Sequence, residues 1–221
     1  MKNYCFIFIL FITQWCFAQL PEGFVYAKSI IPDLVEELRY CTENNFVGEA
    51  IDGYEKPVII MTLQTAHALK KVQEDLKKEG LGIKVFDAYR PQQAVNHFVR
   101  WAKVEHDTVM KQTYYPDVKK RNLIPAGYIA SKSRHSSGST LDVTIINLST
   151  GEELDMGSPY DFFGQKSWVK APHLDKEHRK NRDVLQKVMA KHGFRNYMQE
   201  WWHFTLRGEP FKNKYFDFIV R

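Results

Sequence analysis

Cysteine is scarce in this chain, and the few cysteines present exclude a fold held together by disulfides. The 221 residues contain three of them, Cys5, Cys16 and Cys41. The first two lie in an N-terminal segment that we expect to be removed, so the mature chain keeps Cys41 alone and forms no internal disulfide. A packed core must hold the fold instead, and 44% hydrophobic with 14% aromatic residues is enough to form one.

The chain also lacks an extended run of charge of one sign. Its 31 basic and 26 acidic side chains are mixed along the sequence and give a formal net charge of +5. The one short basic concentration, KEHRKNR at 176–182, is interpreted as a solvated helix face rather than a nucleic-acid site. We therefore expect no nucleic-acid partner.

No internal repeat, low-complexity tract or linker rich in proline, glycine and serine interrupts residues 25–221. A chain of this length is about the size of one large domain. We expect a single domain over residues 19–221, while the sequence leaves the oligomeric state open.

The N-terminus lacks an apolar run long enough for a stable membrane span. Instead, Lys2 precedes a short apolar run over residues 5–12, and the small residue Ala18 follows. This is the layout of a secretory signal peptide, so residues 1–18 are predicted to be removed and the protein to be exported, either to the periplasm or out of the cell. Cleavage before Cys16, as in a bacterial lipoprotein, is the alternative, which the bulky residue before that cysteine disfavours.

Apolar residues that recur every three or four positions predict three helices, and β-rich runs predict four strands. The helices cover residues 62–80, 91–107 and about 175–192, and the strands cover 83–90, 127–133, 140–148 and 201–206. Thr62 is a candidate N-cap, and Gly80 and Gly193 are stop signals after the first and third helices. The turn-rich residues 150–164 are expected to form a long ordered loop. This organisation is one of mixed helices and strands.

A histidine and an aspartate, His135 and Asp142, flank the six residues SSGSTL. The glycine and serines can turn the chain back, and the following strand can project Asp142 toward the histidine. Imidazole nitrogen and carboxylate oxygen suit Zn²⁺, so the pair predicts part of a zinc site. The alternative for His135 is an ordinary loop histidine bonded to a backbone carbonyl.

A second pair, Glu200 and His203, stands inside the aromatic sequence EWWHF. A carboxylate and an imidazole in such surroundings are costly without partners, which makes His203 the best candidate for a third zinc ligand. Residues three apart in a regular strand face opposite sides, so a shared site requires an irregularity just before Trp202. The alternative is a surface glutamate beside tryptophans that merely fill the core.

Three protein ligands leave the fourth position of zinc open, as in catalytic rather than structural sites. Glu200 suits the role of a general base that takes a proton from a zinc-activated water and passes it to the leaving amine. Arg90, in DAYRP, is the candidate cation for the oxyanion that forms, unless it simply pairs with Asp87. The remaining histidines are interpreted as ordinary residues.

Several separate motifs occur in a familiar order between about Val25 and Arg221. They are RYCTENNFVG, DGYE, DAYRP, TYYPD, ASKSRHSSGSTLDVTI, MGSPYDFF, EWWHF and YFDF. Together they resemble the zinc-dependent D-alanyl-D-alanine dipeptidases. The His-x6-Asp spacing alone is shared with related D,D-carboxypeptidases and the hedgehog signalling domain, whereas its combination with MGSPYD and EWWHF resembles the dipeptidase branch.

The resemblance implies a fold, a cofactor and a set of site residues. The fold is α+β, a single domain with a central, mostly antiparallel sheet flanked by helices. The cofactor is one Zn²⁺ per chain. The implied residues are the zinc ligands His135, Asp142 and His203, the general acid/base Glu200, the transition-state cation Arg90, and the substrate contacts Tyr40, Ser133 and Asp161. Asp161 suits the free ammonium of a small dipeptide substrate.

Three functions remain open on the sequence. The leading hypothesis is an exported zinc dipeptidase that hydrolyses D-Ala-D-Ala in the turnover or salvage of wall peptides. A D,D-carboxypeptidase that trims longer wall peptides is the second, and it requires an open cleft instead of a closed pocket with an ammonium partner. A zinc-stabilised module that binds peptides or cell wall without turnover is the third, and the presence of both Glu200 and Arg90 argues against it.

Overall fold

Five strands form the central sheet in the computed structural model, which describes residues 20–221. Their order is β2 (Val35–Glu36), β4 (Leu81–Asp87), β5 (Thr140–Asn147), β7 (Glu200–Leu206) and β6 (Phe194–Tyr197). Only β2 and β4 pair in parallel, so the expected mostly antiparallel sheet is confirmed. The strands β1 (Phe24–Tyr26) and β3 (Ile60–Thr62) form a separate antiparallel pair. The predicted signal peptide, residues 1–18, lies outside the described residues.

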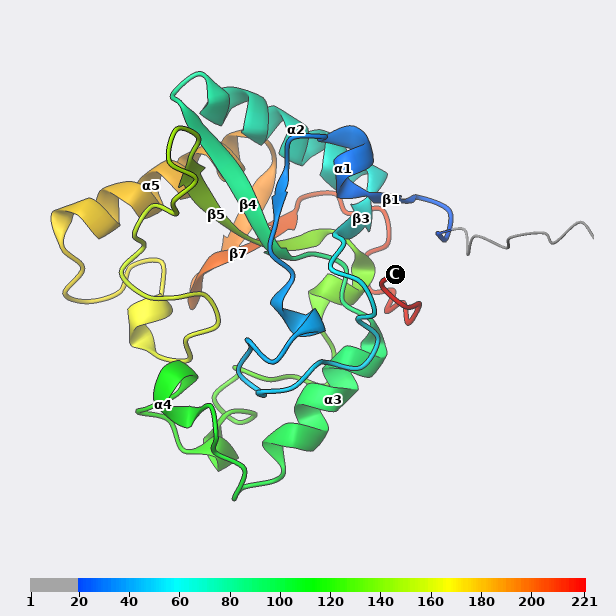
Figure 1. Cartoon of the computed structure of the whole chain (residues 1–221), viewed down its shortest axis with the longest axis vertical. Coiled ribbons are helices and arrows are strands. Elements are labelled where there is room, and N and C mark those ends of the chain that lie inside the picture. Colours follow the sequence, from blue (N-terminus) through cyan, green and yellow to red (C-terminus); the bar gives the residue numbers. More distant parts are fainter. Residues whose placement is uncertain (1–19) are drawn as a thin grey trace, which may run out of the picture.

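The helices lie around this sheet (Figure 1). Two long ones, α2 (Leu63–Lys77) and α5 (Lys176–Lys191), pack against each other and against strands of the sheet. The helices α3 (Gln92–Ala102) and α4 (Lys111–Tyr114) lie at the other end of the molecule. The short helical elements are α1 (Ala27–Ile30), η1 (Arg39–Cys41), η2 (Lys120–Asn122), η3 (Arg134–Ser137) and η4 (Gln165–Ser167). Within residues 20–221, no helix has the length and apolar character needed to cross a membrane.

Sequence signals explain where the long helices begin and which face they bury. Thr62 caps α2 by accepting a hydrogen bond from the backbone N–H of Thr65, and Gly80 adopts φ +70° just beyond its end. The apolar faces expected from the periodicity of α2 and α3 are buried except at Leu63, the first residue of α2, which is 36% exposed. The helix α3 ends at Ala102, five residues earlier than expected. In α5, Leu185 and Met189 are fully buried.

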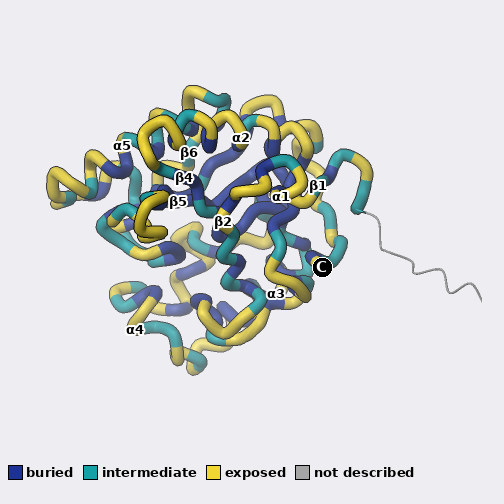
Figure 2. Tube along the Cα trace, turned by 45° about the horizontal axis from the view of Figure 1, so that its top comes forward, coloured by how far each residue is buried: buried dark blue, intermediate teal, exposed yellow. Residues whose placement is uncertain are grey.

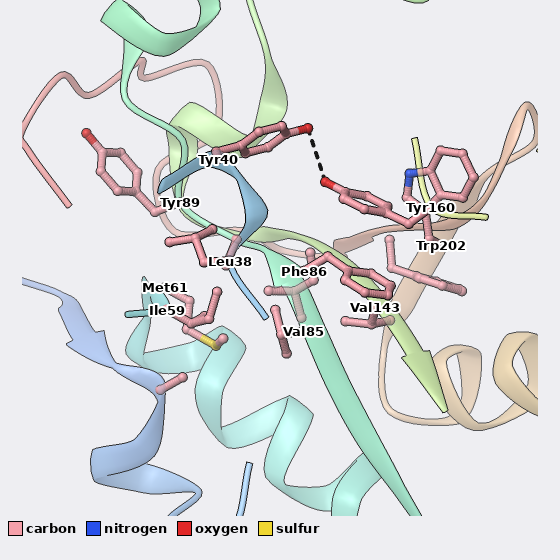
Figure 3. Close-up of a cluster of buried hydrophobic side chains, with 14 of the residues drawn as sticks. Leu38, Tyr40, Ile59, Met61, Val85, Phe86, Tyr89, Val143, Tyr160 and Trp202 are labelled. Atoms are coloured by element: carbon pink, nitrogen blue, oxygen red, sulfur yellow. Dashed lines mark hydrogen bonds between the residues drawn. The ribbon is translucent and has the colours of Figure 1, made fainter. Parts of the chain in front are cut away.

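The core lies between these helices and the sheet, where the strands β4, β5 and β7 are buried along most of their length (Figure 2). Aliphatic and aromatic side chains from β3, β4 and β5 meet there, as Figure 3 shows. The ring of Phe86 stacks on that of Tyr160, with centroids 4.4 Å apart, and Tyr160 meets Trp202 edge to face. These aromatic contacts fasten the loop that carries Tyr160 to the sheet.

Two sequence predictions are wrong. Residues 127–133 form no strand; their backbone turns after η2, where the N–H groups of Tyr128 and Ile129 both bond to the carbonyl of Leu123. The basic run 176–182 is not wholly a solvated face, because Asn181 and Arg182 are buried. A pattern of side-chain types could not show that the partners of Arg182 are backbone carbonyls of a loop packed against α5.

Candidate metal centre and substrate pocket

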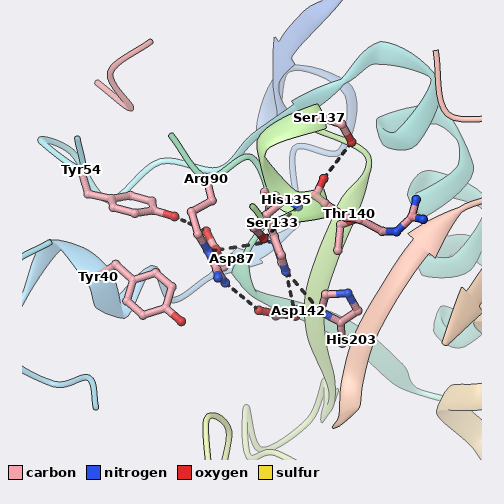
Figure 4. Close-up of polar contacts among 12 residues, drawn as sticks. Tyr40, Tyr54, Asp87, Arg90, Ser133, His135, Ser137, Thr140, Asp142 and His203 are labelled. Carbon is pink, nitrogen blue, oxygen red and sulfur yellow. Dashed lines mark hydrogen bonds and ion pairs between the residues drawn. The ribbon is translucent and has the colours of Figure 1, made fainter. Parts of the chain in front are cut away.

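The pairing of β5 with β7 places two of the predicted ligands side by side. Asp142 lies directly opposite His203 in the antiparallel register. Side chains of residues directly opposite one another project from the same face of a sheet and approach closely. The Nδ1 atom of His203 is 3.1 Å from Oδ1 of Asp142 (Figure 4).

His135 reaches the same point from the 3₁₀-helix η3, which precedes β5. Ser133 caps η3 by accepting a hydrogen bond from the N–H of His135, and Gly138 ends it with φ +79°. Glycine is required at 138 by this backbone angle, and also because an added Cβ would lie 2.2 Å from the ring of Phe24. The turn brings Nε2 of His135 to 3.4 Å from Oδ1 of Asp142.

The three candidate ligand atoms have the spacing that a tetrahedral metal demands. They are separated by 3.1, 3.3 and 3.4 Å. Ligands about 2.0–2.1 Å from a tetrahedral Zn²⁺ lie about 3.3–3.4 Å from one another. Oδ1 of Asp142 is buried and accepts no hydrogen bond, so an acceptor without a partner faces the two imidazoles. These residues therefore fit a zinc ion.

Neighbouring groups orient the imidazole of His135 for this role. Its Nδ1 donates to the carbonyl of Ala88 at 2.8 Å, which leaves Nε2 as the free nitrogen. Burial lowers the pKa of His135 against the opposing effect of Asp142, and so favours the neutral, ligating form. A hydrogen bond from His135 to a backbone carbonyl was the alternative to metal binding in the sequence analysis. The two are compatible, because the bond uses Nδ1 and the metal would use Nε2.

The second carboxylate oxygen of Asp142, Oδ2, contacts Tyr160 and Arg90. Tyr160 donates to Oδ2 at 3.2 Å, and Nη2 of Arg90 lies 3.4 Å from the same atom. Burial alone would raise the pKa of Asp142, but His135 and His203 lower it well below its usual range. Asp142 is therefore an anion whose free oxygen faces the two histidines.

Glu200 lies beside this cluster because β7 is irregular where it begins. Tyr197 pairs with Glu200 while the preceding residue of β6 pairs with Phe204, so the residues between them bulge out of register. The predicted irregularity is confirmed. Oε2 of Glu200 is 3.4 Å from Nδ1 of His203, and burial raises the pKa of Glu200 to about 7, against the opposing effect of His203.

Arg90 faces the cluster from the segment that follows β4. Its Nε donates to Asp87 at 2.8 Å, and its guanidinium lies 5.3 Å from the ring centroids of both Tyr40 and Phe98. Asp87 is itself fully buried and accepts a further hydrogen bond from Tyr54. Arg90 contacts both Asp87 and Asp142, so two carboxylates fix the position of its guanidinium beside the cluster.

A cavity of about 260 Å³ brings all eight predicted site residues together. Asp161 borders it with the backbone at φ +61°, and one of its carboxylate oxygens accepts a 2.8 Å hydrogen bond from Tyr40. Burial raises the pKa of Asp161 well above its ordinary value, and the charge of Asp142 adds to the effect. Ser133 also borders the cavity, although its hydroxyl already caps η3.

The histidines interpreted as ordinary stay outside this cavity. His97, for example, bonds to Glu49, and His192 to Asp75. Sequence reasoning missed Tyr160 as a partner of Asp142 and considered Asp87 only as a competitor for Arg90. The motif MGSPYD contains Tyr160 but carries no local sign that its hydroxyl reaches β5.

The chain is similar in sequence to known peptidases. A family model described as D-ala-D-ala dipeptidase matches residues 21–221. A D-alanyl-D-alanine dipeptidase of Enterococcus faecium is 40% identical over 90% of this chain and 98% of its own length. Another, of Enterococcus faecalis, is 39% identical over 91% of this chain and 100% of its own length. Among solved structures, the D,D-pentapeptidase VanY in complex with Zn(II) matches with a TM-score of 0.40 and 12% identity, over 72% of this chain and 78% of VanY.

Proposed function

Because this chain belongs to the D-ala-D-ala dipeptidase family of peptidases, we propose that it is a zinc-dependent dipeptidase that hydrolyses D-Ala-D-Ala to two D-alanines. One observation supports this most strongly. Three ligand atoms 3.1–3.4 Å apart, a carboxylate and a fixed cation all border one small cavity that also contains a buried acid.

Each of these groups has a part in peptide hydrolysis. His135, Asp142 and His203 would hold a zinc ion, which would supply a water whose pKa is lowered toward about 7 and a Lewis acid for the peptide carbonyl. Glu200 accepts the proton of the attacking water and later donates it to the leaving amine. Arg90 provides a positive charge for the oxygen of the peptide carbonyl as negative charge develops on it.

The cavity favours a dipeptide over a longer wall peptide. Its volume of about 260 Å³ lies below the ~300–1,000 Å³ of pockets for drug-sized ligands. Asp161 can pair with the free ammonium of the substrate while Tyr40 holds the other oxygen of its carboxylate. A carboxypeptidase substrate has a blocked amine at this position, so it would leave Asp161 without that partner.

The function is tested with purified mature protein, with and without a chelator that is later replaced by zinc. D-Ala-D-Ala, L-Ala-L-Ala and a wall pentapeptide are supplied separately, and released amino acids are measured. Hydrolysis of D-Ala-D-Ala that the chelator abolishes and zinc restores is the expected result. Preference for the pentapeptide would instead identify a carboxypeptidase, and zinc binding without any turnover a binding module.

Metal content gives a prediction that does not depend on turnover. The wild-type protein should bind about one Zn²⁺ per chain, and a double variant, His135→Ala with His203→Ala, should bind none at the same site. The double variant His67→Ala with His106→Ala is the control, because both residues are exposed and lie outside the cavity. Elemental analysis after dialysis makes the comparison, and full zinc occupancy in the first variant would contradict the assignment.

Blocking the amine of the substrate should separate a dipeptidase from a carboxypeptidase. A charge-assisted hydrogen bond contributes about 1.5–3 kcal/mol, so acetylated D-Ala-D-Ala should be cleaved at least ~10-fold less efficiently than the free dipeptide. Asp161→Asn should reduce the ratio of the two efficiencies, because it lowers the cleavage of the free dipeptide more than that of the acetylated one. Asp117→Asn, which changes an exposed aspartate, is the control and should leave the ratio unchanged. The measurement is kcat/KM for both substrates. Equal values in the wild type would refute the assignment of Asp161 as the partner of the substrate ammonium.

We further propose that the protein is exported and acts on dipeptides released from the cell wall. Lys2, the apolar run at 5–12 and Ala18 support removal of residues 1–18 by a signal peptidase. The mature chain is then expected to begin at Gln19, as read by N-terminal sequencing of the periplasmic or secreted fraction. A lipid-modified peptide that begins at Cys16 would identify a lipoprotein instead.

A further inference from the structure

The helix α5 buries an arginine that the proposed mechanism does not use. Arg182 is 1% exposed, although it ends the basic run 176–182 whose other charged residues are largely exposed. Among the described residues, no carboxylate forms an ion pair with it. Burial of a cation without an anionic partner is costly, so its remaining contacts must compensate.

All three nitrogens of the Arg182 guanidinium donate to backbone carbonyls of a single loop. Nε donates to Met156 at 2.6 Å, Nη2 donates to Lys166 at 2.7 Å, and Nη1 donates to Trp168. We name residues 156–168 the acid loop, because Asp161 lies near its middle. One rigid guanidinium therefore holds the two ends of the acid loop together.

Further bonds close the acid loop on itself. Asn181, next to Arg182, donates to the carbonyl of Asp155 at 2.9 Å. Within the loop, the hydroxyls of Ser158 and Ser167 lie 3.1 Å apart, and Ser167 donates to the carbonyl of Phe162 at 2.6 Å. The loop thus has few ways to move without breaking contacts to α5.

The middle of the acid loop carries the two side chains that the pocket requires. Tyr160 donates to the metal-facing carboxylate of Asp142, and Asp161 accepts from Tyr40. Asp161 adopts φ +61°, a left-handed conformation that a residue other than glycine keeps only where its surroundings impose it. The surroundings here are a loop whose ends are fixed by Arg182.

We propose that Arg182 is a positioning residue: by closing the acid loop, it holds Asp161 where the ammonium of the substrate binds. This inference rests on the proposed function for the role of Asp161, but not for the closure of the loop. Arg182 does not border the substrate cavity and acts only through the loop. A lysine at this position keeps the charge but cannot present three nitrogens in one plane.

The first test needs no substrate. In R182K, amide hydrogen exchange is expected to be faster across residues 156–168 and unchanged across 134–147 and 200–206, which carry the metal ligands. R179K is the matched control, since Arg179 lies one turn earlier in α5 and is exposed. Exchange in the acid loop of R182K equal to that of the wild type would overturn the inference, whatever reaction the protein catalyses.

The second test measures whether Arg182 affects substrate binding through the position of Asp161. R182K should retain its zinc and nearly its kcat, while KM for D-Ala-D-Ala rises about 10- to 100-fold, the loss expected when a binding group is misplaced. In a D161N background, R182K should add little further change, because the group that it positions is already impaired. Equal effects of R182K in both backgrounds, or an unchanged KM in R182K, would show that Arg182 only stabilises the fold.

A milder variant keeps the inference testable if R182K does not fold. N181A removes the single bond to Asp155 beside the acid loop, and a smaller increase of exchange across the same residues is expected. Wild-type exchange in N181A would then overturn the inference. Failure of the wild-type protein to cleave D-Ala-D-Ala would refute the proposed function alone, since the exchange experiments stand independently of it.

Discussion

Glu200→Gln is expected to keep zinc and fold but to lower kcat for D-Ala-D-Ala by about 10²- to 10⁴-fold. The amide has nearly the shape of the carboxylate but cannot accept the proton of the attacking water. It also cannot return a proton to the leaving amine, so both proton transfers are lost together. The measurement is kcat on protein whose zinc content is shown to equal that of the wild type.

The control for this variant is Glu152→Gln, which neutralises an exposed carboxylate in the turn after β5. It should hydrolyse D-Ala-D-Ala at the wild-type rate. Because Glu200 lies 3.4 Å from His203, zinc content decides how a loss of activity is interpreted. A Glu200→Gln protein with full zinc content and wild-type kcat would show that Glu200 is not the general base.

Arg90→Lys is expected to lower kcat by about 10²- to 10³-fold, the usual loss when one donor to a developing oxyanion is removed. Lysine retains a positive charge, but one ammonium cannot bond to Asp87 and also face the cavity as the guanidinium does. Zinc should stay bound, because the three ligands come from η3, β5 and β7 rather than from β4.

Arg100→Lys is the matched control for this prediction. Arg100 lies in α3, pairs with Asp52 and has a side chain that is 60% exposed. Such a surface pair contributes little, so the control should differ from the wild type by less than about twofold in kcat. If Arg90→Lys behaved like Arg100→Lys, stabilisation of the oxyanion would have to come from another group.

Two of the alternatives offered by the sequence turn out not to exclude the functional roles. His135 does bond to a backbone carbonyl, but through Nδ1, and this bond orients Nε2 toward Asp142. Arg90 does pair with Asp87, but through Nε, while Nη2 remains near Asp142. Histidine and arginine each have more than one polar atom, so one structural bond can fix the direction in which another atom acts.

The sequence by itself determined which chemical groups are available and much of the local structure. Helical periodicity and capping residues gave α2, α3 and α5, since these signals arise from residues within four positions of one another. The residue types at 135, 142, 200 and 203 predicted a metal and a base, because a buried carboxylate or imidazole requires a partner.

Only the tertiary structure decided how these groups meet. The register that sets Asp142 opposite His203 joins residues 61 positions apart, and no local pattern specifies it. The same is true of the hydrogen bond from Tyr160 to Asp142. It is also true of Arg182, which lies in a polar stretch typical of a surface but donates to carbonyls of a loop 14 to 26 residues away. Local sequence determines backbone periodicity, whereas the burial and pairing of a charge depend on which distant segment packs against it.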